Sequence, residues 1–342
     1  MIKGKDWSME HEPFDGREVD DPDLYPICNR KIEYDTVIMH LVPEYYPYWI
    51  KRESGKRMVG YVVWETDKIP KHWPKLLNMP DILLVPTEWN KNVFKNWGVT
   101  KPIYVIPHII RSSEPLNFDF NNFCDNIHKA DYVFYTIGDW TVRKSIGKTI
   151  QCYLENFSAD DEVVLLIKTS PRDFTRKIIN RFLYHTENTV REILRNYRNP
   201  ARVRLITDEI SDQDILRLHS LGNCYISLCR SEGWGLGAFD AAGFGKPVII
   251  TGYGGPTEYL PRELAYLVDC HQSPVIDNTC KSYSKDQNWA EPELAHASQL
   301  IRAVFEHRDE ADEKGKLLAQ YIQRNFNETL IIEKLVKSLN ES

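Results

Sequence analysis

Short apolar runs alternate with segments of helical periodicity along most of the chain. In the first third, apolar runs bounded by turn residues predict strands at 34–40, 57–64, 81–86 and 103–108. A helix is predicted over 87–97, with Thr87 as its N-cap and Gly98 just after its end. Strands that alternate with helices indicate a parallel α/β sheet covered on both faces.

The same alternation resumes after a stretch rich in Ser, Asn, Asp and Pro at 111–130, which we interpret as a linker between domains. Strands are predicted at 132–137, 163–167, 203–207, 224–228 and 247–251. Helices are predicted at 144–157, 173–197, 212–219 with Ser211 as cap, from about 236 to 245, and over 293–340. The pattern predicts two doubly wound domains in tandem, and such sheets bind ligands at the carboxyl ends of their strands.

We place the first domain at residues 1–125, the second at 126–310 and a C-terminal helix at 311–342. Residues 1–30 are polar and acidic, and we expect them to form irregular structure over the surface of the domain. Because they add no strand to the sheet, the first domain is predicted to be short.

Composition narrows the classes of partner. The net charge is −6 and no run of Lys or Arg stands out, which argues against nucleic acid. No apolar run approaches the roughly 18 residues of a membrane helix, which leaves only peripheral contact with a membrane open. We also expect no signal peptide, because the first residues lack an apolar segment. The seven cysteines include no Cys-x-x-Cys pair, so we expect reduced thiols, a cytoplasmic location and no metal site.

A glycine-rich turn between a predicted strand and helix is the strongest local signal. Gly233, Gly235 and Gly237 place backbone N–H groups and the positive end of a helix at one point, which suits a diphosphate. The spacing also matches the dinucleotide-binding fingerprint, which expects an acid at the end of the next strand. Residues 250–255 read ITGYGG and contain no carboxylate, which argues against that alternative.

Around this turn the chain resembles the retaining GT-B glycosyltransferases, the group with the E-x7-E signature. Residues 232–249 match the family frame E-G-[FW]-G-L-x-x-x-E-A-x-x-x-G-x-P-V-I, with Asp240 in place of the second Glu. Further segments resemble other parts of the family: 64–70, 85–87, 105–108, 138–145 and 254–260. The resemblance implies a GT-B architecture, with two Rossmann-like domains facing across a cleft and the C-terminal helix packing back toward the first.

Three departures from the family pattern stand out. The strand and glycine-rich loop that usually open the first domain are not evident. Residues 138–140 read Gly-Asp-Trp where many members have Gly-Arg-Leu, so Arg143 and Lys144 are the candidates to supply positive charge. Asp240 keeps the second carboxylate but is one methylene shorter than Glu.

The resemblance implies transfer of a hexosyl unit from a UDP- or GDP-sugar, with retention, to a glycan, glycolipid or protein acceptor and without a metal. Glu232 would bind hydroxyls of the sugar, Arg143 and Lys144 would clamp the diphosphate, and Glu65 is a further catalytic candidate. Asp240 would accept hydrogen bonds from the ribose. The full donor-side set is Glu232, Gly233, Trp234, Gly235, Leu236, Gly237, Asp240, Thr207 and Asp208, and the acceptor-side candidates are His40, Trp64 and Thr66.

Other interpretations stay open at this stage. Asp240 has a structural alternative, because an acid in the first turn of a helix is stabilising by itself. A strand-end histidine such as His40 is also commonly structural. For the whole chain, the alternatives are a non-catalytic module that binds sugar nucleotides, or another GT-B enzyme such as an epimerase.

Overall fold

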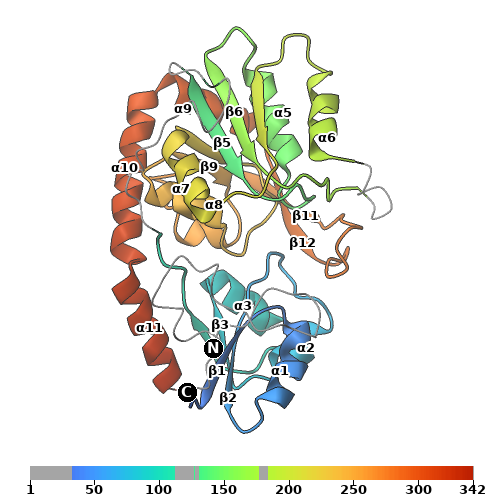
Figure 1. The fold of residues 1–342 in the computed structure, drawn as a ribbon, viewed down its shortest axis with the longest axis vertical. Helices are drawn as coiled ribbons and strands as arrows, with labels where there is room; N and C mark the ends of the chain where they lie inside the picture. The colour runs from blue at the N-terminus through green and yellow to red at the C-terminus, as the bar shows by residue number, and fades with distance from the viewer. Residues whose placement is uncertain (1–32, 112–126, 128–130, 177–183, 342) are drawn as a thin grey trace.

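The computed structural model describes residues 33–111, 127, 131–176 and 184–341, and contains two separate parallel sheets (Figure 1). In the first, β1 (Thr36–His40), β2 (Arg57–Tyr61), β3 (Ile82–Val85) and β4 (Ile103–Val105) lie side by side in chain order. Helices α1 (Tyr46–Arg52), α2 (Trp73–Leu77) and α3 (Glu88–Asn96) belong to this lobe. The predicted strands are confirmed, with shorter bounds, and so is Thr87 as the N-cap of α3.

The second sheet has six strands in the order β10-β9-β8-β5-β6-β7. They are β5 (Tyr132–Ile137), β6 (Val163–Lys168), β7 (Arg202–Ile206), β8 (Cys224–Ser227), β9 (Val248–Thr251) and β10 (Tyr266–Val268). The strand order reverses between β5 and β8, which makes the carboxyl ends of these two strands the topological switch point of the sheet.

Both faces of the second sheet are buried, which explains its continuous apolar strands. Val164 and Leu166 of β6 enter one core cluster, while Val163, Leu165 and Ile167 enter the other. Successive side chains of a strand point to opposite faces, so a strand covered on both sides is apolar at every position. Helices α5 (Ile146–Asn156), α7 (Asp212–Leu221), α8 (Leu236–Gly243) and α9 (Leu294–Glu306) provide the cover.

The prediction of a helix over 173–197 is wrong for its first part, because α6 spans only Thr186–Leu194. Before it, Asp173 is fully buried and accepts hydrogen bonds from Thr175 and Thr189, which holds residues 173–176 in a loop. Residues 177–183 lie outside the described part of the chain. Helix α7, by contrast, begins with the predicted Ser211 cap, which forms a reciprocal capping box with Asp214.

An antiparallel hairpin that the hydrophobic pattern did not reveal joins the two lobes. It pairs β11 (Cys270–Pro274) with β12 (Asn288–Pro292). Asp67 of the first lobe accepts a hydrogen bond from the Asn288 side chain at 2.9 Å. The sequence of β11, CHQSP, has little apolar character, and all five of its residues are at least partly exposed.

The C-terminal region returns to the first lobe. The segment predicted as one helical stretch is divided into α9, α10 (Arg308–Asn325) and α11 (Glu328–Asn340). Helix α10 crosses the end of α8 at Gly315, where a side-chain carbon would overlap the Gly245 carbonyl. Ile331 of α11 then packs with Val59, Ile82 and Leu84 of the first sheet. The two red helices in Figure 1 therefore run along both lobes.

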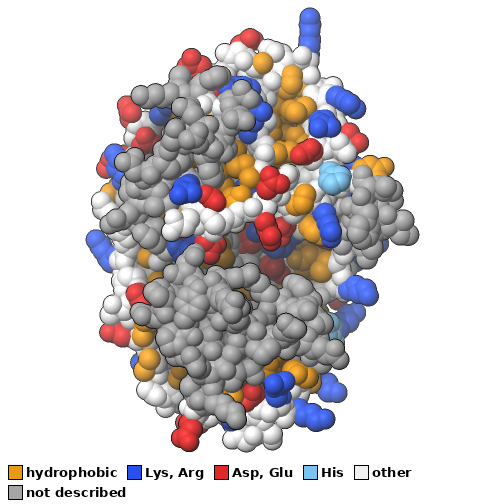
Figure 2. All heavy atoms as spheres, in the orientation of Figure 1, with side chains coloured by type: hydrophobic (Ala, Val, Ile, Leu, Met, Phe, Trp, Pro, Cys, Tyr) orange, Lys and Arg blue, Asp and Glu red, His pale blue; other side chains and the backbone are white. Residues whose placement is uncertain are grey.

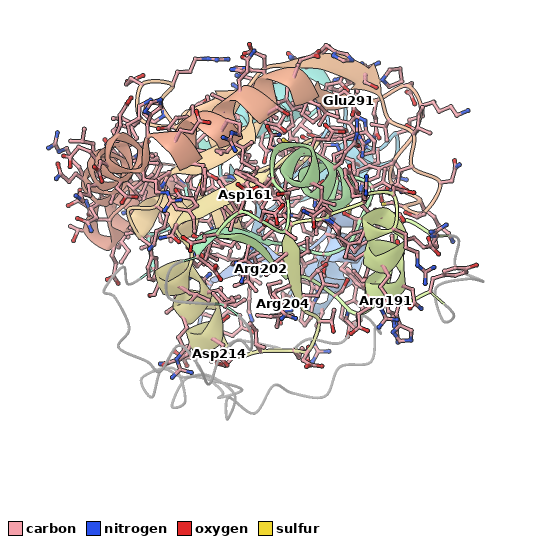
Figure 3. The ribbon with its side chains drawn as sticks, turned by 90° about the horizontal axis from the view of Figure 1, so that it is seen from above. Asp161, Arg191, Arg202, Arg204, Asp214 and Glu291 are labelled. Atoms are coloured by element: carbon pink, nitrogen blue, oxygen red, sulfur yellow. The ribbon has the colours of Figure 1, made fainter. Side chains whose placement is uncertain are left out.

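The far edge of the second sheet is polar. Arg202 and Arg204 lie two residues apart on β7, in front of the sheet in Figure 3. Arg202 forms an ion pair with the buried Asp131 at the start of β5. Charged side chains on an edge strand discourage pairing with other chains. Among the helices that the structure describes, none is both long and apolar enough to cross a bilayer.

Candidate functional site

The candidate site lies at the switch point, where the loops after β5 and β8 meet. Arg143 and Lys144 come from the first loop and Glu232 from the second. Gly138 lies at the base of the first loop, and a side-chain carbon there would lie 3.3 Å from the Lys144 side chain. Its lack of a side chain lets Lys144 run along the backbone toward Glu232.

Glu232 sits between two cations. Its carboxylate accepts a hydrogen bond from Arg143 Nη1 at 2.9 Å and another from Lys144 Nζ. Arg143 Nη1 also donates to the Ser231 carbonyl at 2.8 Å, and Arg143 Nη2 lies 3.4 Å from Glu65 Oε1. The structure thus brings together all four predicted catalytic residues, and Glu65 joins them from the first lobe. Acidic side chains gather along the boundary between the lobes in Figure 2.

Glu232 and Arg143 are held in their charged forms although burial disfavours charge. Burial by itself raises the pKa of Glu232, but Lys144 and Arg143 hold that pKa below its usual value. Burial likewise opposes the charge of Arg143, but Glu232 and Glu65 raise its pKa above the ordinary range. Opposite charges within a few ångströms favour the charged forms of both partners. The site therefore presents preorganised cations beside a carboxylate.

The amino end of α8 opens beside this cluster. Gly235 adopts a left-handed backbone with φ of 90° as the N-cap, and Leu236 is 51% exposed at the first helical position. Gly237 is partly exposed as well. A helix amino end of this kind attracts anions through its N–H groups and its dipole. Gly235, Leu236 and Gly237 thus lie where a diphosphate was predicted.

Gly233 and Trp234 have other surroundings. A side-chain carbon on Gly233 would overlap Val63 and lie 2.7 Å from the Trp64 carbonyl, so the two lobes meet closely here. Trp234 is buried and packs against Phe239 and Tyr259. Gly233 and Trp234 therefore shape the glycine-rich turn through packing contacts with the rest of the protein.

Asp240 departs most from its predicted place. Its side chain is only 1% exposed, and its Oδ2 accepts two hydrogen bonds from Arg111, one of them from Nε at 3.1 Å. Asp240 Oδ1 and the nearby His219 Nε2 are both buried, and neither has a hydrogen-bond partner among the described residues. Burial raises the pKa of Asp240 even though Arg111 opposes that rise. The structure therefore turns this acid toward Arg111 rather than toward open space.

The three acceptor-side candidates do not form one group. Trp64 and Thr66 are buried, and the Trp64 indole donates to Thr66 Oγ1 at 2.7 Å. His40 lines a separate cavity of about 270 Å³ with Tyr61, His108 and residues of α11. Trp64 and Thr66 therefore have internal partners.

Thr207 and Asp208 follow β7, the edge strand two places from β5. Thr207 is partly exposed and Asp208 is exposed. Strand β6 lies between β5 and β7, so Thr207 and Asp208 lie toward the edge of the sheet, away from the Glu232 cluster.

Several contacts hold the lobes together near the site. The Glu258 carboxylate accepts hydrogen bonds from the backbone N–H groups of Glu88 and Trp89, at 2.9 and 2.6 Å, in the first turn of α3. Ser231 Oγ donates to the Glu65 carbonyl. Glu258 of the second lobe therefore caps a helix of the first lobe.

Arg111 is the site residue that sequence reasoning missed. It lies at the start of the segment interpreted as a linker, and 129 residues separate it from Asp240. Its one local signal is a basic side chain a few residues beyond the end of β4. Within the described residues, no group of three His, Cys, Asp or Glu could hold a metal ion.

Ser145 has an unusual backbone. Its φ of 51° and ψ of 36° are left-handed, and it is the only described residue other than glycine with positive φ. Ser145 directly follows Lys144, in the loop between β5 and α5. A left-handed backbone costs an L-residue roughly 1–2 kcal/mol.

We expect Ser145→Gly to raise the free energy of unfolding by about 0.5–1 kcal/mol, because glycine adopts this conformation without the steric cost. Chemical denaturation would measure it. Ser220→Gly, in the right-handed helix α7, is the matched control and should lower stability by a similar amount. A loss of stability in both variants would contradict the prediction.

Comparisons with known proteins agree with this architecture. No protein-family model matches the chain. A protein of Acidianus filamentous virus 1, provisionally named the glycosyltransferase ORF313, is 22% identical over 274 residues; the match covers 76% of this chain and 72% of that protein.

Solved structures of the same fold are more numerous. Sucrose-phosphate synthase from Thermosynechococcus elongatus superposes with a TM-score of 0.68 at 14% identity, over 91% of this chain and 74% of its own. Anabaena Alr3699/HepE, in complex with UDP and glucose, gives 0.66 at 10% identity, over 90% and 78%. The E. coli trehalose-6-phosphate synthase, bound with UDP-2-fluoro glucose, gives 0.65 at 13% identity, over 93% and 75%. The chain therefore has the GT-B fold, and the resemblance drawn from its sequence is confirmed at that level.

Proposed function

We propose that this chain, which has the GT-B fold, is a retaining glycosyltransferase that moves a hexosyl unit from a UDP- or GDP-sugar to a glycan, glycolipid or protein acceptor. The observation that carries the proposal is the buried Glu232 held between Arg143 and Lys144 beside the amino end of α8. Similar proteins that contain UDP or a UDP-sugar support the choice of donor class.

The chemistry requires stabilisation of a leaving nucleoside diphosphate. As the bond from the sugar to the β-phosphate breaks, negative charge grows on the phosphate oxygens. Arg143 and Lys144 are fixed in place before the donor binds, so they stabilise this charge with little reorganisation. The amino end of α8 adds backbone N–H groups on the same side.

The two carboxylates hold and orient these cations. Glu232 contacts both of them, and Glu65 reaches Arg143 from the first lobe. When a diphosphate enters, it competes with Glu232 for the cations, and the Glu232 oxygens then become acceptors for hydroxyls of the sugar. Through this contact, the position of Arg143 depends on how the first lobe packs against the second.

A panel of labelled UDP- and GDP-sugars tests the proposal, with release of nucleoside diphosphate and the anomeric configuration of the product followed by NMR. Lys144→Met should lower turnover by about 10²-fold, because one cation at the phosphate is lost. Lys148→Met is the matched control, since Lys148 pairs with Glu291 instead. Binding without turnover would indicate a non-catalytic module, and a wild-type protein that neither binds nor turns over any donor would refute the proposal.

A further inference from the structure

The buried Asp240 and the half-exposed Arg111 form a pair that the proposed chemistry does not use. Arg111 Nε and Nη2 both donate to Asp240 Oδ2. The exposed fractions of the two side chains are 38% for Arg111 and 1% for Asp240. The acid therefore lies behind the guanidinium, and a ligand approaching from solvent meets Arg111 first.

The pair lies between the two helices beside the switch point. Asp240 belongs to α8, and Arg111 Nη1 also lies 3.8 Å from Asp212 Oδ1 at the start of α7. Arg111 thus bridges the first turn of α7 and the body of α8. Helix α7 is the next helix after the carboxyl end of β7, and an α/β sheet of this order binds its ligand at the carboxyl ends of its strands.

The segment before Arg111 is held firmly. The Ile110 N–H donates to the Phe326 carbonyl at 3.1 Å, and the Ile110 side chain packs on α8 so closely that a carbon on Gly243 would lie 2.7 Å from it. Arg111 is thereby held near α8 through its neighbour Ile110 as well as through Asp240. A guanidinium held in this way loses little conformational entropy when it binds a ligand.

We propose that Arg111 binds the nucleoside diphosphate of the donor directly and that Asp240 acts as its positioning residue, without itself touching the ligand. This inference rests on the proposed function. The Arg111 guanidinium donates hydrogen bonds to oxygen atoms of the nucleotide. This differs from the role predicted for Asp240, whose carboxylate would accept hydrogen bonds from the ribose hydroxyls if it were exposed. The shorter side chain of Asp240 fits this role, because it keeps the acid within the helix packing and leaves room for Arg111.

Calorimetric binding of UDP and GDP to the full chain tests this directly. Arg111→Ala should weaken binding of the nucleotide that the wild type prefers by about tenfold or more. Asp240→Ala should weaken it similarly, and the double variant should be no weaker than either single one, because both changes remove the same contact. Arg111→Lys should restore only part of the affinity, since Lys lacks the planar fork.

The controls separate this inference from the proposed function. Arg302→Ala removes an equally exposed arginine, paired with Glu306 on the outer helix α9, and should leave binding unchanged. Thermal unfolding of each variant checks that the fold is retained. If the wild type binds neither nucleotide, the proposed function is overturned. If the wild type binds and Arg111→Ala binds equally well or more tightly, Asp240 contacts the ribose itself and only this inference is overturned.

Discussion

Substituting Glu232 by Gln is expected to lower turnover of the preferred donor by two to three orders of magnitude. The amide removes the charge that aligns Arg143 and Lys144, so two partly buried cations lose the carboxylate that they share. It also removes the acceptor proposed for the sugar hydroxyls. Loss of one preorganised electrostatic contact at a developing charge typically costs about 10²–10³ in rate. Steady-state kinetics with a labelled donor would measure it.

The same variant should show a change in stability that the nucleotide reverses. Breaking a buried ion pair by removing one partner costs on the order of 3 kcal/mol. A bound diphosphate supplies negative charge to the same cations, so UDP or GDP should recover part of this loss in a thermal shift.

Glu291→Gln is the matched control for Glu232→Gln. Glu291 is also a partly buried acid between two cations of the second lobe, with Arg230 Nε at 2.9 Å and Lys148 on its other side. The Glu291→Gln variant should lose stability without a comparable loss of turnover. If Glu232→Gln and Glu291→Gln behaved alike, with normal turnover in both, Glu232 would have only a structural role.

Acidification is expected to destabilise the protein from about pH 6.5 downward, with His219 as a principal cause. His219 is fully buried in the second lobe, and burial, together with Arg111 and Lys246, lowers its pKa from 6.5 to about 3. Below pH 6.5, His219 binds a proton in the unfolded chain but stays neutral in the folded chain. The free energy of unfolding therefore falls with pH until the pH reaches the pKa of His219 in the folded state. One such group costs about 2.5 kcal/mol between pH 7 and pH 4.5.

Two further groups, His108 and Asp240, modify this pH dependence. Burial lowers the pKa of His108 to about 4, so it acts in the same direction as His219. Asp240 faces His219 and its pKa is raised, so protonation of Asp240 in the folded state opposes the loss. His219→Gln should therefore reduce the slope of unfolding free energy against pH by up to one proton, without abolishing it.

Denaturant unfolding at several pH values between 7 and 4.5 would measure this slope. His271→Gln is the control, because the His271 side chain is 62% exposed on the hairpin strand β11. An unchanged slope in His219→Gln would show that the buried imidazole is not the cause of the loss of stability on acidification.

Much of the fold could be predicted because its signals are local. The strands of a parallel sheet are buried on both faces, so runs such as 163–167 are apolar at every position. Helix starts at Thr87 and Ser211 were visible because a capping side chain bonds to the backbone three residues away. The hairpin β11–β12 was missed because it is stabilised by contacts with the rest of the molecule, and its polar first strand has no hydrophobic pattern.

The sequence by itself was enough to predict two α/β lobes and a glycine-rich turn beside a helix amino end. It also identified Glu232, Arg143 and Lys144 as the charged residues near that turn. Each of these depends on interactions between residues close in the chain. Only the tertiary structure decided that both Arg143 and Lys144 contact Glu232, that Glu65 joins them, and that Asp240 faces Arg111. These pairs lie 78 or more residues apart: the nearest, Glu65 and Arg143, are on different lobes. Their geometry depends on how two sheets and a returning helix pack, because a side chain's burial and partner are set by the surfaces around it and not by its neighbours in sequence.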